Sequence, residues 1–334
     1  MPSTVYVGIV TYNSLPDLPP LLRALSAQTY SSLVITLLDN ASTDGTREWL
    51  RTNANHLNWL LLRQNLGFGR GHNRILQLWN DHMQPTDFYL ALNPDVIMQP
   101  DYIERLVAGL QATNAGWGTG KLIQTDTKRI YSAGHALYKD GYAFNIGYGL
   151  PDDSQLDEPR EVFGAPAAAA LYRKAMIDSI ALDGAFFDPL MFMYGEDVDV
   201  DWRARLHGWQ CRYVPDAVAY HRGSHASAKL RTEALANRYL SVMRNADRFD
   251  YYTYNLPRIL LHCAFRLLVT PRLGAALIGK LSQYGSKVRA HPTEWRITPA
   301  TMRQWFAWSS SQPTAQPHTL SQRLRSFFSR TPKR

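Results

Sequence analysis

Short apolar runs rich in β-branched residues alternate with longer helical patterns in the first third of the chain, and this alternation restricts the fold more than any other feature. The runs predicted as strands are VYVGIV (5–10), LVITLLD (33–39), NWLLLR (58–63) and DFYLAL (87–92). The segments predicted as helices between them are 17–25, 46–53 and 71–79. Strands separated by helices form βαβ units, so the pattern predicts an α/β fold with a largely parallel, Rossmann-like sheet flanked by helices.

The pattern loosens after a helix predicted at 101–111. The later elements that we expect are an antiparallel ribbon (129–148), an exposed loop (151–160), helices at 171–180 and 193–209, and a strand or hairpin (211–221). Beyond 226 the chain reads as basic helices, in which Leu256, Leu260, Ala264, Leu267 and Leu268 share one face. Arg258, His262 and Arg266 line another face at intervals of four residues.

Charge divides the chain into two regions. Residues 1–221 carry 17 Lys and Arg against 24 Asp and Glu, a net charge of −7, whereas residues 222–334 carry 19 against 4, a net charge of +15. We therefore expect a domain at 1–225, a basic helical region at 226–308 and a flexible basic tail at 309–334. The excess of basic residues does not indicate nucleic-acid binding, because the first region is acidic and the second has no recognised nucleic-acid-binding motif.

The cysteines and the apolar stretches indicate the cellular compartment. Cys211 and Cys263 are too few for a disulfide framework and lack metal-ligand spacing, so we expect a reducing environment. The N-terminus resembles no signal peptide, and the most apolar stretch, ILLHCAFRLLV, is interrupted by His262 and Arg266. The sequence therefore predicts a cytoplasmic protein without a membrane span.

Polar side chains follow every predicted strand of the first half. They are Thr11, Tyr12 and Asn13; Asp39, Asn40, Ser42 and Asp44; Arg63 and Asn65; and Asn93 and Asp95. Ligands of a doubly wound sheet bind at the carboxyl ends of its strands, so these groups predict one binding site. A single cluster such as DNASTDGT would equally well make a turn and a helix cap.

The glycines of RQNLGFGRGHN (63–73) do not make a dinucleotide fingerprint. Their spacing is GxGxG, and they follow the third strand rather than the first, which excludes the usual nicotinamide-binding pattern. Two interpretations stay open: glycines such as Gly71 let the backbone approach a ligand diphosphate, or they permit a tight loop before the next helix.

Asp95 and His221 are the candidate metal ligands. Asp95, in LNPDV, stands at a strand end where a carboxylate suits Mg²⁺ or Mn²⁺ bridging substrate phosphates. His221 ends an apolar strand and would supply a second ligand if the fold brings it beside Asp95; otherwise it is a capping or core histidine.

The segment MFMYGEDVDVDWRARLHGW (191–209) concentrates carboxylates at a predicted helix start. Asp199 with Arg203 and Asp201 with Arg205 are spaced as i,i+4 pairs, which explains them structurally. That explanation leaves out Glu196 and Asp197, so these two are the candidate proton acceptors.

Taken in order, VGIVTYN, LLDNASTDGT, RQNLGFGRGHN, LNPDV, FGAPAAAALYRK and FMYGEDVDVDWRARLHGW resemble the bacterial family 2 glycosyltransferases of the inverting GT-A type, particularly the rhamnosyltransferase-like branch. The resemblance covers about residues 4–225. It implies a GT-A nucleotide-diphospho-sugar transferase fold, to which the C-terminal helices are an appendage.

The resemblance also implies roles for individual residues. Thr11, Asn13, Asp39 and Arg63 would hold the nucleotide, with Tyr12, Asn65, Gly71 and Asn93 beside it. Asp95 would bind Mn²⁺ or Mg²⁺ together with His221, Asp197 would be the general base with Glu196 next to it, and Gly164, Ala165 and Trp202 would lie near the sugars. Asn93 stands where many members have aspartate, which lowers the negative charge available to the metal.

The implied reaction is inverting transfer of a sugar from a nucleoside-diphosphate donor to a glycan or lipid-linked glycan of a cell-surface polysaccharide. The sugar donor expected for this branch is dTDP-L-rhamnose, which supplies L-rhamnose. The alternatives are a UDP-hexose or galactofuranose transferase and, more distantly, a non-catalytic nucleotide-sugar or nucleic-acid binding protein.

The basic region has two possible roles. It either docks on an anionic membrane surface through 256–334, on the inner face of the cell membrane, or is an ordinary helical cap or homodimer interface.

Overall fold

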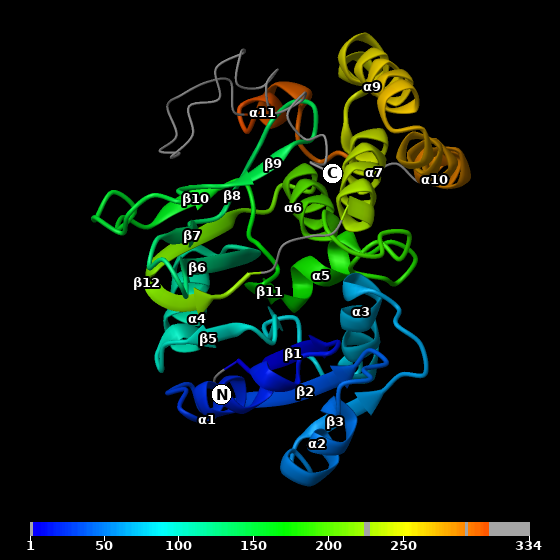
Figure 1. Cartoon of the computed structure of the whole chain (residues 1–334). Coiled ribbons are helices and arrows are strands. Elements are labelled where there is room, and N and C mark those ends of the chain that lie inside the picture. The colour runs from blue at the N-terminus through cyan, green and yellow to red at the C-terminus, as the bar shows by residue number, and fades with distance from the viewer. Residues whose placement is uncertain (1–2, 224–227, 291–292, 307–334) are drawn as a thin grey trace.

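The computed structural model describes residues 3–223, 228–290 and 293–306 (Figure 1). A ten-stranded mixed sheet forms its centre, and a separate two-stranded sheet, β8–β9, lies beside it. The strands are β1 (Val5–Thr11), β2 (Leu33–Asp39), β3 (Asn58–Leu61), β4 (Phe88–Leu92), β5 (Val96–Met98), β6 (Trp117–Gln124), β7 (Ile130–Ser132), β8 (His135–Leu137), β9 (Ala143–Asn145), β10 (Arg160–Val162), β11 (Ala169–Arg173) and β12 (Cys211–His221).

Helices cover both faces of the sheet. Those of the first region are a 3₁₀ turn η1 (Leu15–Asp17), α1 (Leu18–Ser26), α2 (Thr46–Asn53), α3 (Phe68–Trp79), α4 (Tyr102–Thr113), α5 (Lys174–Ile180) and α6 (Glu196–Leu206). Alternate residues of β1 enter different cores, because side chains of a strand point to opposite faces. Val5, Val7 and Ile9 pack with α1, α2 and α4, whereas Tyr6 packs in a second core with α3, α5 and α6.

The main sheet has the order β10-β12-β6-β11-β4-β1-β2-β3. Strands β3, β2, β1 and β4 are parallel, with Thr11 opposite Asp39, so their carboxyl ends meet at one edge as predicted. Strand β11 runs antiparallel between β4 and β6, and β12 is parallel to β6.

One prediction in the middle of the chain is wrong, and one strand there was not predicted. Residues 171–173, expected in a helix, belong to β11, and the helix α5 starts only at Lys174. Strand β6 was not expected, because WGTGKLIQ contains two glycines that weaken a strand pattern. A Cβ on Gly118 would lie 2.4 Å from the carbonyl oxygen of Arg212, and one on Gly120 would lie 2.0 Å from that of Ala217. Close approach of β12 to β6 therefore explains both glycines.

The C-terminal region is helical, as predicted. Its elements are α7 (Ala228–Asn245), α8 (Arg248–Asp250), a π-helical turn η2 (Tyr251–Asn255), α9 (Leu256–Val269), α10 (Pro271–Ala290) and α11 (Pro299–Arg303). Figure 1 shows α7 beside α6, with α9 and α10 beyond α7 as seen from the sheet. One apolar cluster joins Trp202 and Leu206 of α6 to Ala236 and Tyr239 of α7. The predicted tail at 309–334 lies outside the described residues.

Among the residues that the structure describes, no helix is both long enough and apolar enough to cross a membrane.

Candidate functional site

Hydrogen bonds join the loops that follow β1 and β2. Asn13 adopts a left-handed backbone conformation (φ 51°). Its backbone N–H donates to Oγ of Ser42 at 2.9 Å, and its side-chain oxygen accepts from the backbone N–H of Thr43 at 2.8 Å. Asp44 accepts from the backbone N–H of Leu15 at 3.0 Å. The two polar clusters predicted at neighbouring strand ends therefore form one continuous rim, beside which the Tyr12 ring is exposed.

Asn40 connects this rim to the glycine-rich loop after β3. Its side-chain oxygen accepts from the backbone N–H of Leu66 at 2.8 Å, and its amide donates to the carbonyl of Gly67 at 3.1 Å. Within the loop, Asn65 accepts from the N–H of Gly67 at 2.8 Å. Gly71 is buried in α3, and a Cβ there would lie 2.8 Å from Val10, so its missing side chain permits α3 to pack on β1. This packing role is neither of the two interpretations predicted for the glycines. Gly67, with φ 85° immediately before α3, supports the tight loop instead.

The Asp39 carboxylate is fully buried at the end of β2. Oδ2 accepts from Nε of Arg47 at 2.7 Å, and the backbone N–H of Ser42 lies 3.3 Å from both carboxylate oxygens. Arg63, predicted to hold the nucleotide, is exposed and follows Leu62, whose N–H donates to the Asp39 carbonyl at 2.9 Å. Arg47 was not predicted, because nothing in TREWLRTN distinguishes it from an ordinary surface arginine of a helix.

Asp95 and His221 lie side by side, although 126 positions separate them. Oδ1 of Asp95 is 3.3 Å from Nε2 of His221, because β12 pairs with β5 and His221 stands opposite Val96. Burial favours the neutral carboxyl, but the hydrogen bond and charge of His221, with Arg222, hold the pKa of Asp95 below its ordinary value. The condition under which His221 was predicted to be a ligand is therefore met.

The donor set of this pair fits a divalent cation. It offers one carboxylate oxygen and one imidazole nitrogen, and Mn²⁺ accepts both kinds of ligand. No group of three or more His, Cys, Asp or Glu side chains with metal-ligand geometry occurs in the described part of the chain. A cation held here would therefore take its other ligands from substrate oxygens and water, as Mg²⁺ and Mn²⁺ commonly do.

The segment before β11 brings Asp197 to the same place. The carbonyl of Ala168 accepts from the N–H of Asn93 at 2.8 Å, and the N–H of Ala167 donates to Oδ2 of Asp197 at 3.3 Å. Asn93, two positions before Asp95, and Asp197 of α6 thus bond to adjacent alanines of FGAPAAAALYRK.

Tyr131 of β7 lies beside His221 and is close enough to Asp95 and Asp197 to be influenced by both charges. Its ring packs edge-on against His221, with centroids 4.3 Å apart. Burial, followed by the charges of Asp197 and Asp95, raises the pKa of Tyr131 to about 12. The phenol therefore stays protonated and can donate a hydrogen bond near both acids. Tyr131 was not predicted, because nothing in the sequence distinguishes it from the other tyrosines of the segment 129–148.

The two acids of the ED pair occupy different environments. Glu196 is buried, and burial followed by the charge of Asp197 raises its pKa to about 8. Asp197 is partly exposed, and its Oδ1 accepts from the N–H of Val198 at 2.9 Å. At neutral pH Glu196 is mostly protonated, so the accessible Asp197 is the better proton acceptor of the two.

A buried network fixes the side of α6 that faces the sheet. Asp201 accepts from Nε1 of Trp117 at 2.8 Å and from the N–H of Ala165 at 3.1 Å, and Nδ1 of His135 lies 2.8 Å from its other oxygen. A Cβ on Gly164 would lie 1.9 Å from the Asp201 carboxylate. Gly164 and Ala165 therefore act on the site through Asp201, by letting α6 approach.

The predicted pairing of Asp201 with Arg205 is wrong. Arg205 instead bonds to Glu161 and to the carbonyls of Val162 and Phe163, because α6 presents it to strand β10. The Asp199–Arg203 pair is confirmed, with Nε to Oδ2 at 2.8 Å.

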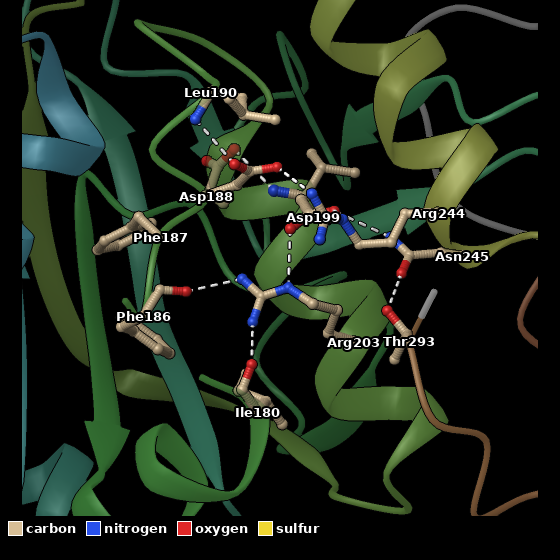
Figure 2. A network of polar contacts seen from close by, with 12 residues as sticks. Ile180, Phe186, Phe187, Asp188, Leu190, Asp199, Arg203, Arg244, Asn245 and Thr293 are labelled. Carbon is tan, nitrogen blue, oxygen red and sulfur yellow. Dashed lines mark hydrogen bonds and ion pairs between the residues drawn. The ribbon is translucent and has the colours of Figure 1, made fainter. Parts of the chain in front are cut away.

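Figure 2 shows that the Asp199–Arg203 pair belongs to a larger buried network. Arg203 donates to the carbonyls of Ile180 and Phe186, while Asp199 accepts from Asn245 of α7 at 3.0 Å. Burial opposes the charge on Asp199, yet Arg203 and Arg244 hold the pKa of its carboxyl below the ordinary value. Removing one partner of such a buried network commonly costs about 3–5 kcal/mol, so it firmly connects α6 to α7.

The turn that precedes α6 is held by the C-terminal region. Tyr194 (φ 67°) and Gly195 (φ 91°) are both left-handed, a conformation that costs free energy for tyrosine. The Asn237 side chain donates to the carbonyls of Met193 at 3.1 Å and Tyr194 at 2.8 Å, and Lys280 donates to Asn237 at 2.8 Å. Helices α7 and α10 thus support the turn that immediately precedes Glu196 and Asp197.

Trp202 lies away from the strand-end rim. It is fully buried in the cluster beneath α7, where its ring meets Phe306 edge-on at 6.0 Å. A side chain without exposed surface has no room to contact a sugar, so we assign Trp202 to the core.

The mixed sheet, with acids gathered at the ends of its parallel strands, is that of a glycosyltransferase of the GT-A fold. Residues 6–180 match the family model described as glycosyl transferase family 2. The chain belongs to this family and is a rhamnosyltransferase-like member of it, as the motifs predicted.

Two curated proteins illustrate the similarity. The chain is 27% identical over 259 residues to an N-acetylglucosaminyl-diphospho-decaprenol L-rhamnosyltransferase of Mycobacterium tuberculosis strain H37Rv, an alignment that covers 72% of this chain and 83% of that protein. It is 23% identical over 201 residues to rhamnosyltransferase WbbL of Escherichia coli K12, which covers 55% and 75%.

Solved structures share the fold at lower identity. GalNAc-T7, crystallised with UDP, GalNAc and Mn²⁺, superposes with a TM-score of 0.57 at 15% identity over 75% of this chain and 50% of that chain. Staphylococcus aureus TarS superposes with a TM-score of 0.52 at 13% identity over 86% of this chain and 55% of that chain. The match spans about half of each solved chain.

Proposed function

We propose that this glycosyltransferase moves L-rhamnose from dTDP-L-rhamnose to a lipid-linked glycan, with inversion at the anomeric carbon. The observation that carries the proposal is the position of Asp197. Its partly exposed carboxylate accepts a hydrogen bond from the N–H of Ala167, and the next residue, Ala168, accepts one from the N–H of Asn93. The rhamnose and the lipid-linked acceptor rest on the mycobacterial relative, whose name specifies both.

In this mechanism Asp197 accepts the proton of an acceptor hydroxyl while that oxygen attacks the anomeric carbon. The new carbon–oxygen bond forms on one face of the sugar as the bond to the diphosphate breaks on the other, and the bonding electrons leave with the diphosphate. A positioned base of this kind contributes about 10²–10⁴ in rate. Neutral Glu196 beside it leaves Asp197 as the anion of the pair.

The rim of strand ends would hold the donor. Asn13, on the loop that joins β1 to the β2 turn, and exposed Arg63 would contact the nucleotide, and Asp39 would read the base if Arg47 moves from its carboxylate. Asp95 and His221 would hold Mn²⁺ or Mg²⁺, which when bound offsets the charge that develops on the leaving diphosphate. Tyr131, protonated and adjacent to His221, would donate a hydrogen bond to a substrate oxygen.

A panel of nucleotide sugars tests the proposal. The purified protein is incubated with Mn²⁺, a lipid-linked N-acetylglucosamine acceptor and each donor in turn, and the released nucleoside diphosphate is measured. We expect release of dTDP from dTDP-L-rhamnose and its dependence on the acceptor. Release of UDP from a UDP-hexose or from UDP-galactofuranose instead would overturn the choice of donor, and no release from any donor would overturn the activity.

A further inference from the structure

The outward face of α9 is apolar. The exposed residues recur at helical spacing, as Pro257, Leu260, Leu261, Ala264, Leu267 and Leu268. Leu260 is 60% exposed, Leu261 71% and Leu268 84%. The buried residues of α9 are instead Ile259 and Cys263. The leucines, which the sequence pattern alone would place in a core, therefore point away from the protein interior.

The segment 249–269, which ends with α9, holds most of the large apolar side chains that are exposed in the described residues. Phe249 is 67% exposed, Tyr252 57% and Val269 43%. Elsewhere in the described residues such side chains occur singly, as Leu78 does on α3. Scattered exposed leucines need no explanation, but a contiguous row indicates a surface that binds something.

The charged side chains of the segment 251–290, which includes the α9 leucines, are all positive. Residues 251–290 contain no Asp or Glu and six basic residues, namely Arg258, Arg266, Arg272, Lys280, Lys287 and Arg289. Lys280 pairs with Glu233. Arg258 donates to the Tyr254 carbonyl at 2.9 Å and stacks on the Tyr254 ring. Within the described residues, no salt bridge joins a carboxylate to Arg258 or to Arg272. An apolar row bordered by uncompensated cations suits a negatively charged lipid surface.

We infer that α9 lies flat in the interface of an anionic bilayer, with Leu260, Leu261, Leu267 and Leu268 at the boundary of headgroups and acyl chains. The inference rests on the proposed function, because a lipid-linked acceptor would be presented at that surface. A second copy of the chain fits the face less well: in a two-fold dimer the arginines of both copies would meet without an acid between them.

Vesicle flotation of the full-length protein tests this surface. Vesicles of phosphatidylcholine with phosphatidylglycerol are compared with vesicles of phosphatidylcholine alone. We expect the double variant L261N/L268N to lose about tenfold or more of its partitioning to the anionic vesicles. The double variant R258Q/R272Q should lose about tenfold on anionic vesicles and nothing on neutral ones. Leu78→Asn, on the far helix α3, is the matched control and should bind like the parent protein.

The results that contradict the inference are distinct. Equal binding by the parent protein and L261N/L268N would assign any membrane affinity to another part of the chain. A dimer in solution that dissociates on L261N/L268N, measured by light scattering after size exclusion, would assign the face to a second copy. An activity assay with a short-chain, water-soluble acceptor and no vesicles distinguishes failure of the membrane inference from failure of the proposed function. The α9 variants should keep this activity even when they no longer float with the vesicles.

Discussion

Asn237 of α7 donates a hydrogen bond of 2.8 Å to the carbonyl oxygen of Tyr194, 43 positions earlier in the chain. Tyr194 is left-handed and immediately precedes Gly195 and the acidic pair of α6. The C-terminal helices thereby hold the turn that sets the direction of Asp197. The basic region is an integral support of the candidate site and more than an appendage.

Asn237→Ala should lower both stability and turnover. The amide is fully buried and joins two carbonyls to Lys280, so its loss should reduce the free energy of unfolding by about 1–3 kcal/mol, measured by urea denaturation. If the turn positions Asp197, kcat should fall about tenfold or more while KM for the donor changes little. Asn245→Ala is the control, since Asn245 is an equally buried asparagine of α7 that contacts Asp199 instead. Equal losses of kcat in both variants would show that Asn237 acts through general stability.

Asp197→Asn and Glu196→Gln should differ sharply. The first removes the proposed base and should lower kcat by at least about 100-fold, with donor binding nearly intact. The second replaces a mostly protonated carboxyl by an amide of similar shape, so kcat near neutral pH should stay within about threefold. Single-turnover transfer at saturating donor measures both. Retention of more than a tenth of the turnover by Asp197→Asn would exclude Asp197 as the base.

Glu196 should make the protein less stable as the pH rises. Its pKa is about 8 in the folded protein against an ordinary 4.5, so between these values the unfolded chain releases a proton that the folded protein keeps. The contribution of Glu196 to the free energy of unfolding should therefore be highest below about pH 4.5 and should fall by about 5 kcal/mol as the pH rises to about 8. Glu196→Gln should remove this part of the slope. Parallel pH curves for the two proteins, from urea denaturation, would contradict the raised pKa.

Removal of divalent metal should abolish transfer, and Mn²⁺ or Mg²⁺ should restore it. Asp95→Asn should raise the Mn²⁺ concentration needed for half-maximal activity by at least about tenfold, because one of the two proposed protein ligands loses its charge. Thermal shift with dTDP and Mn²⁺ gives a second readout without turnover. Asp81→Asn, an exposed acid at the end of α3, serves as control and should need no more Mn²⁺ than the parent. Full activity in excess EDTA would refute metal dependence.

Gly164→Ala separates a sugar-contacting role from a packing role. The new Cβ would lie 1.9 Å from the buried Asp201 carboxylate, so the variant should lose about 2 kcal/mol or more of stability in urea denaturation. Gly279→Ala, in the open middle of α10 with no atom near the added methyl group, should instead gain about 0.5–1 kcal/mol. A stable Gly164→Ala protein with only a raised KM would favour contact with the sugar.

The sequence by itself determined the parallel half of the fold. Strands β1 to β4 and the helices between them carry a clear period of apolar residues, and four strands pointing the same way bring Thr11, Asp39 and Asn93 to one edge without further information. The order of motifs likewise specified the family, because each motif lies on a local element whose pattern is complete within a dozen residues.

Only the tertiary structure decided what lies next to the acids. β6 and β11 have weak local patterns because their neighbours in the sheet, more than their own sequences, hold them extended. The pairing of Asp95 with His221, the burial of Glu196 and the support of Tyr194 by Asn237 each join residues from distant elements. A residue's charge state and partners depend on such long-range contacts, whereas the periodicity of apolar residues reports only which side of its own element is covered.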